Sequence, residues 1–128
     1  MFVARKRATL LYPSGPSDDP FKYHLFVILT EPYGPARQIV MVPICSIVDG
    51  QFHDPTCLIN VGDHPFIRHP SYVAYAKGRE QFAQDLANGV ANGGVSDRGL
   101  IDEAVFARIV VGAPNSKFTK PFIKKALR

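Results

Sequence analysis

Two apolar runs that lie close together in the sequence constrain the fold of this chain more than any other feature. The first covers residues 24–30 (HLFVILT) and the second covers residues 38–46 (QIVMVPICS), with a turn-rich segment containing Pro32, Gly34 and Pro35 between them. Both runs are rich in β-branched residues and are much shorter than a membrane span. They therefore predict two neighbouring, buried strands of a compact sheet.

Further strands are expected on both sides of this pair, and helices only after residue 76. The five expected strands cover residues 7–12, 24–30, 38–46, 56–61 and 71–76. Apolar residues at helical spacing follow around residues 82–87, from just after Ser96 to Gly112, and from Thr119 onward. Strands followed by helices favour an α+β fold, with an antiparallel sheet or a small barrel closed by helices. We predict a single domain over residues 1–128, with a β core at 1–76 and a helical part at 77–128.

The positive charge of the chain is concentrated near its ends. Fifteen Lys and Arg residues against eleven Asp and Glu residues give a net charge of +4, and no acidic residue follows Glu103. If the basic segment Arg5–Arg7 lies near the basic C-terminal part, the two form one positive surface able to attract phosphates. A solvated helix face is an equally favoured interpretation. The nucleic-acid-binding candidates in the C-terminal part are Lys117, Lys120 and Lys124.

The cysteines and histidines predict neither a metal site nor a secreted protein. Cys45 and Cys57 lack CxxC spacing and are expected to be small buried thiols, which favours a reducing, cytoplasmic location. No signal-peptide core or membrane-length apolar stretch is present in the sequence, so we expect no membrane partner. His53, Cys57, His64 and His69 are a loose set with weak ligand spacing, and we expect no bound metal and no cofactor.

The segment from residue 62 to residue 75 is denser in potential functional groups than any other. It contains Asp63, His64, Arg68, His69, Ser71, Tyr72 and Tyr75. Gripping or cleaving RNA needs cations for phosphate, an imidazole for proton transfer and aromatic rings for exposed bases. The alternative is a proline-pinned loop whose aromatic rings fill the core and whose histidines bond the backbone, and we favour this for the individual histidines. The loop as a whole remains the expected functional region, with Arg68, His69 and Tyr72 as nucleic-acid-binding candidates.

The order of these segments resembles the PemK/MazF-like toxin family over residues 8–127. The two apolar runs are followed by Ser71-Tyr72-Val73, by Gly99-Leu100-Ile101 and by a closing helix, in the order seen in that family. The resemblance implies a small antiparallel SH3-like β-barrel of about five strands followed by helices. It also implies a cytoplasmic toxin of a toxin–antitoxin system, a metal-independent endoribonuclease that acts on single-stranded RNA, with an antitoxin protein and a second copy of the chain as partners.

The resemblance also implies a catalytic set, from which this chain departs in two places. The basic residue that the family has before the second strand corresponds to Lys22 or His24, and the threonine of its Pro-Ile-Thr-Ser segment is Cys45, with Ser46 retained. In the implied reaction Lys22 stabilises the phosphorane, His24 exchanges protons and Ser46 orients the phosphate. Lysine lacks the planar fork of arginine, and a thiol replaces a hydroxyl. A second interpretation is therefore open, in which the same barrel is a non-catalytic module that binds nucleic acid or protein.

Overall fold

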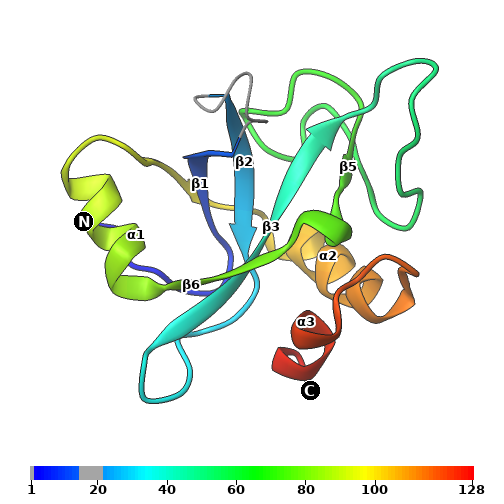
Figure 1. Ribbon diagram of the computed structural model, residues 1–128. Coiled ribbons are helices and arrows are strands. Elements are labelled where there is room, and N and C mark those ends of the chain that lie inside the picture. Colours follow the sequence, from blue (N-terminus) through cyan, green and yellow to red (C-terminus); the bar gives the residue numbers. More distant parts are fainter. Residues whose placement is uncertain (1, 15–21) are drawn as a thin grey trace.

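The computed structural model describes residues 2–14 and 22–128, which form one antiparallel sheet with helices on both faces (Figure 1). The strands are β1 (Ala8–Pro13), β2 (Tyr23–Ile28), β3 (Gln38–Ser46), β4 (Leu58–Ile59), β5 (Ser71–Val73), β6 (Arg79–Phe82) and β7 (Ser96–Leu100). The helices are the 3₁₀ turn η1 (Tyr75–Lys77), α1 (Ala83–Ala91), α2 (Glu103–Asn115) and α3 (Pro121–Ala126). The predicted α+β class is confirmed.

The sheet has seven strands in the order β4-β5-β3-β2-β1-β7, with β6 pairing β3. The nine-residue strand β3 organises it, because its first half pairs with β6 and its last residues pair with β5 on the same edge, while β2 occupies the other edge. The outermost strands, β4 and β7, do not pair with each other in the described part of the chain. The sheet is therefore not closed into a barrel, whereas the sequence led us to expect a small barrel of about five strands.

Two strands lie in the part of the chain that was predicted to be helical. Strand β6 pairs with the first half of β3, and β7 pairs with β1. The prediction of a helix starting after Ser96 was wrong, because α2 begins at Glu103, where the side chain of Asp102 accepts hydrogen bonds from the backbone N–H groups of Ala104 and Val105. The first three residues of β7 are polar and most of the strand is exposed, so backbone pairing with β1, and not hydrophobicity, makes this segment a strand.

Alternation along β2 and β3 gives the sheet two different faces. Leu25 and Val27 of β2 belong to the core under α2 and α3, which we call the α2/α3 face. Phe26 and Ile28 belong to a second core that includes Leu86 of α1, which we call the α1 face. Figure 1 shows α1 on one side of the sheet and α2 and α3 on the other. The period-2 geometry of a strand is what distributes one apolar run over both cores.

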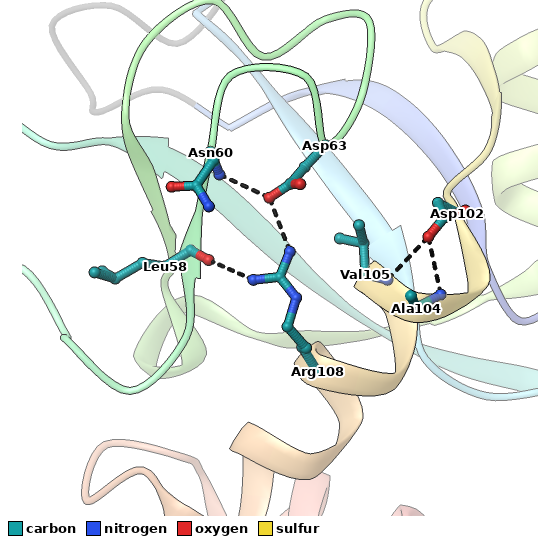
Figure 2. Close-up of polar contacts among 7 residues, drawn as sticks. All are labelled: Leu58, Asn60, Asp63, Asp102, Ala104, Val105 and Arg108. Atoms are coloured by element: carbon teal, nitrogen blue, oxygen red, sulfur yellow. Dashed lines mark hydrogen bonds and ion pairs between the residues drawn. The ribbon is translucent and has the colours of Figure 1, made fainter.

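Helix α2 is tied to the loop that follows β4 by one arginine (Figure 2). The guanidinium of Arg108 donates to the backbone oxygen of Leu58 at 3.1 Å and to Oδ2 of Asp63 at 2.9 Å. The same carboxylate oxygen accepts the backbone N–H of Asn60 at 2.7 Å. These contacts fix the start of the 62–75 segment against α2.

The expectation for the cysteines is confirmed. Both Cys45 and Cys57 are buried, and both are free thiols. None of the helices in the described residues combines the length and the apolar character needed to cross a membrane.

Candidate nucleic-acid interface

A cavity of about 620 Å³ lies at the end of the sheet where β2, β3 and β5 meet the loop that precedes β5. Strand pairing brings together segments that are up to 55 residues apart in the chain, from Lys22 to Lys77. Six residues predicted from the sequence line this cavity: Lys22, His24, Ser46, Arg68, His69 and Tyr72. The two groups of candidates, one catalytic and one for nucleic-acid binding, thus share one hollow.

The cavity is strongly basic. Lys77, at the end of η1, lines it together with Lys22 and Arg68. None of the described residues that line it is a carboxylate. The ion pairs found within residues 2–14 and 22–128 lie elsewhere, between Arg7 and Glu103 and on Arg108. The positive charge at the cavity is therefore available to an anionic ligand.

His24 is the imidazole best placed for proton transfer. Its Nδ1 lies 2.8 Å from Oγ of Ser14, which fixes the ring, and the backbone N–H of Ser14 donates to the backbone oxygen of Lys22. Burial lowers the pKa of His24, and the positive charges of Lys22, Lys77 and Arg79 lower it further. At neutral pH the ring is therefore uncharged and able to accept a proton.

The side chain opposite His24 is a thiol. Leu25 pairs with Ile44, so one step further along this antiparallel register places His24 opposite Cys45. Residues that lie directly opposite each other in an antiparallel pair point to the same face, so Cys45 shares the face of His24. Side chains alternate along β3, so Ser46 points to the other face, with Ile44. Burial raises the pKa of Cys45, which keeps the thiol protonated. Ser46 is exposed and also lines the cavity, but its register position is on the other face from His24.

Aromatic rings complete the lining of this cavity. Tyr23 is 44% exposed and Phe66 is 41% exposed, and both line it together with Tyr72. The ring of Tyr72 packs against that of His53, with 5.6 Å between their centroids. Exposed rings beside cations are the arrangement on which unpaired bases stack.

His64 has a structural role, as favoured for the individual histidines. Its Nδ1 accepts the backbone N–H of Phe66 at 3.0 Å, so the proton is on Nε2, which lies 3.1 Å from the backbone oxygen of Arg98 and 3.0 Å from Oγ1 of Thr9. Burial lowers the pKa of His64 and favours this neutral form. The residue ties the loop before β5 to β1 and β7, so that the loop can hold Arg68 and His69 at the cavity.

The remaining basic candidates are not all at the site. Lys120 lines a second, adjoining cavity, whereas Lys117 and Lys124 line neither of the two. In the N-terminal basic segment, Arg7 bonds the backbone oxygen of Ile101 and pairs with Glu103. The cations that line the two cavities come from residues at or near β2, the loop before β5, η1, β6 and α3.

Two basic residues of this region, Lys77 and Arg79, were missed from the sequence. They flank Gly78 directly after the predicted strand 71–76, and this Lys-Gly-Arg triplet was the available signal. Their proximity to His24 arises only because η1 folds the chain back onto β3.

The loose histidine and cysteine set does not converge. Within residues 2–14 and 22–128, no three His, Cys, Asp or Glu side chains are arranged to hold a metal ion. Comparison of the chain with protein-family models and with curated proteins finds no match. A functional assignment therefore depends on the chemistry of the site itself.

Proposed function

We propose that this chain is a metal-independent endoribonuclease that acts on single-stranded RNA, as the toxin-like member of a toxin–antitoxin pair. One observation carries the proposal. The three catalytic candidates, Lys22, His24 and Ser46, line the same cavity as Arg68 and Tyr72, and no carboxylate is among its described lining residues. The location is cytoplasmic in this proposal, and the partners are an antitoxin protein and a second copy of the chain.

The residues of the cavity suit cleavage by the 2′-hydroxyl of RNA. Neutral His24 takes the proton of that hydroxyl, the 2′ oxygen bonds to the adjacent phosphorus, and the bond from phosphorus to the 5′ oxygen breaks. The leaving 5′ oxygen then takes a proton from the imidazolium that forms on His24 in the first step. Lys22 and Lys77 stabilise the negative charge that develops on the phosphorane. The products are a 2′,3′-cyclic phosphate and a 5′-hydroxyl.

The rest of the lining suits a single strand better than a duplex. Tyr23 and Phe66 present exposed ring surface, which can stack only on bases that are not already stacked in a helix. Arg68 supplies a planar donor for a flanking phosphate. These features favour unpaired RNA as the substrate.

The fold in this proposal is an unclosed variant of an SH3-like small barrel. Support comes from β3, which pairs with β2 along one edge and with both β5 and β6 along the other, so that the sheet bends around it. The additional strand β7 extends the sheet beyond β1.

Cleavage of a labelled single-stranded RNA in the presence of a chelator tests the proposal. We expect His24→Ala to lower kcat/KM by about 10²- to 10⁴-fold, because it removes the group that takes the proton. Lys22→Ala should also reduce cleavage, and expression of the wild-type chain should arrest growth. The matched control is His53→Ala, since His53 contacts Tyr72 but does not line the cavity. Cleavage that chelation abolishes, or that His24→Ala leaves unchanged, contradicts the proposal.

A non-catalytic binding module is the second candidate, and the thiol opposite His24 favours it. Cys45 is a weak hydrogen-bond donor for a phosphate, and Lys22 lacks the planar fork of an arginine. Salt-sensitive RNA binding fits both candidates. Tight binding without turnover, unaffected by His24→Ala, would select the binding module.

A further inference from the structure

A second cavity, of about 420 Å³, adjoins the first, and two of its cations, Arg79 and Lys120, have no role in the reaction described above. The two share His24, Cys45 and Lys77, and the second is lined in addition by Arg79 and Lys120. We propose that this second cavity is a phosphate subsite, which holds a phosphodiester of the same strand next to the one at His24. The inference rests on the proposed function in taking a nucleic-acid strand as the ligand.

The charge of this cavity is the first argument. Lys77, Arg79 and Lys120 supply three cations around it, and none of its described lining residues is acidic. No ion pair within the described part of the chain involves any of the three. Three cations around one cavity whose described lining carries no counter-charge repel one another, and an anion removes that repulsion.

The position of Arg79 is the second argument. Its guanidinium carbon lies 5.4 Å from the ring centroid of Tyr12 and 5.4 Å from that of Phe26. Stacking on ring faces restrains the side chain while leaving the N–H edge of the guanidinium for a ligand. The planar guanidinium of Arg79 can donate to two phosphate oxygens at once. Because the side chain is already restrained, it loses little conformational entropy when the phosphate binds.

The approach of Lys120 depends on a glycine. A Cβ atom at Gly78 would crowd Cδ1 of the fully buried Ile123, so glycine lets the chain after η1 pack directly against α3 without moving that side chain. That close packing brings Lys120, at the N-terminus of α3, to the cavity, where its Nζ donates to the backbone oxygen of Gly78 at 3.3 Å. The segment around Gly78 and the start of α3 are thus in contact, although they are 42 residues apart in the chain, and this contact places Arg79 and Lys120 at the same cavity.

Continuity with the first cavity identifies the ligand as part of a strand. Lys77 and His24 line both hollows, so an anion in the second lies beside the reacting phosphate in the first. The repeating phosphates of a nucleic acid provide such a neighbour. Extension of a short substrate at one of its ends should therefore strengthen binding through Arg79 and Lys120.

Binding of fluorescein-labelled oligodeoxynucleotides to the full chain tests the subsite without cleavage, because DNA lacks the 2′-hydroxyl. A dinucleotide is compared with versions extended by two nucleotides at the 5′ end or at the 3′ end. For the wild type we expect extension at the end that reaches the subsite to tighten binding about tenfold, as a charge-assisted contact does. Arg79→Gln should remove that gain while keeping any gain from the other end, and should make the slope of log K against log salt shallower by about 0.7.

Two further variants control for folding and for general charge. Lys120→Gln should reduce the same gain, and it is informative even if Arg79→Gln fails to fold. Lys125→Gln removes an exposed lysine of α3 that lines neither cavity, and it should bind every oligonucleotide like the wild type. Thermal melting confirms that each variant is folded.

Three results would overturn the subsite. They are no difference between the two extensions, equal losses in Lys120→Gln and Lys125→Gln, or a hexaglutamate peptide that binds as tightly as the extended DNA and is equally sensitive to Arg79→Gln. Failure of the proposed function is a separate result. A chain that cleaves no RNA but shows the one-ended, Arg79-dependent gain has the subsite without the reaction, and a chain that cleaves RNA without that gain has the reaction alone.

Discussion

The same strands form both faces of the sheet, but the helices cover the two faces to different extents. On the α2/α3 face the apolar residues are sealed by the helices, and the hydroxyl of fully buried Tyr75 donates to the backbone oxygen of Ile109 at 2.6 Å. On the α1 face the core around Phe26 is equally well buried, but at one end of the strands the cavities beside His24 and Cys45 are left open. The helices therefore stabilise the middle of the sheet, whereas the open strand end beside His24 is available for chemistry, and there Leu25 and Ile44 of the α2/α3 core also line the first cavity.

Removing a large side chain from the sealed face should have the largest effect on stability. Ile109→Ala is expected to lower the free energy of unfolding by about 2–5 kcal/mol, because Ile109 is fully buried and its loss leaves a cavity. Val111→Ala on the same helix is the matched control, since Val111 is 63% exposed, and it should change stability by less than about 0.5 kcal/mol. Denaturant unfolding measures both. Equal effects of the two substitutions would mean that α2 does not seal this face.

Adding a methyl group to the same helix should also destabilise. A Cβ atom at Gly112 would lie 2.4 Å from Oη of Tyr75, so Gly112→Ala should lower the free energy of unfolding by about 1–3 kcal/mol. The sign is the test, because alanine normally stabilises a helix relative to glycine by about 1 kcal/mol. Tyr75→Phe removes the crowded oxygen, and the double variant should lose less stability than the two single changes added together. A stabilising Gly112→Ala would show that the tyrosine is free to move.

The buried imidazole of His64 should make the stability of the fold depend on pH. The pKa of His64 is lowered by burial, so the folded state favours the neutral ring, whereas the unfolded chain titrates near the usual value of 6.5. Below that pH the unfolded state binds more protons, and the free energy of unfolding should fall as the pH drops from about 7 until the folded ring also titrates. The His64→Gln variant should show a weaker fall than the wild type between pH 7 and pH 5.

His24 gives the matched comparison for that experiment, since burial and neighbouring cations lower its pKa as well. The His24→Gln variant should also weaken the fall, but it should keep the part due to His64. An unchanged pH profile in His64→Gln would contradict the role given to the hydrogen bonds from this ring to Thr9 and Arg98.

The smallest effect is expected at the contact between α2 and the loop after β4. Arg108→Ala removes the pair with Asp63 and the bond to Leu58, but the arginine side chain is 45% exposed. Exposed pairs of this kind contribute about 0.2–1 kcal/mol. Thermal melting should therefore show a slight decrease in stability that becomes smaller as salt is added. A loss as large as that of Ile109→Ala would mean that this clamp, and not apolar packing, holds the loop.

The strands that carry their own hydrophobic signal were predictable, and those that depend on a partner were not. Residues 24–30 and 38–46 contain enough β-branched residues to indicate β2 and β3 directly. Strands β6 and β7 have polar sequences at or near sheet edges, and only pairing with β3 and β1 makes them strands. The helix start was misplaced for the same reason, since Ser96 resembles a helix cap until β7 is known.

The residues of the site were likewise predictable only in part. Residue chemistry singled out Arg68, His69 and Tyr72, and the structure places them around one cavity with Lys22 and His24. Lys77 and Arg79 were not recognised, because nothing in a Lys-Gly-Arg triplet shows which strand it will lie beside.

The amino-acid sequence by itself determined which segments are apolar, which are turns and which carry cations and imidazoles, because these are local properties of side chains. Only the tertiary structure decided which face each strand residue occupies and which distant cations share a cavity. Register and close packing set those neighbours, as at His24 opposite Cys45 and at Gly78 against Ile123. Such contacts depend on where two separate segments meet, and no local pattern encodes that.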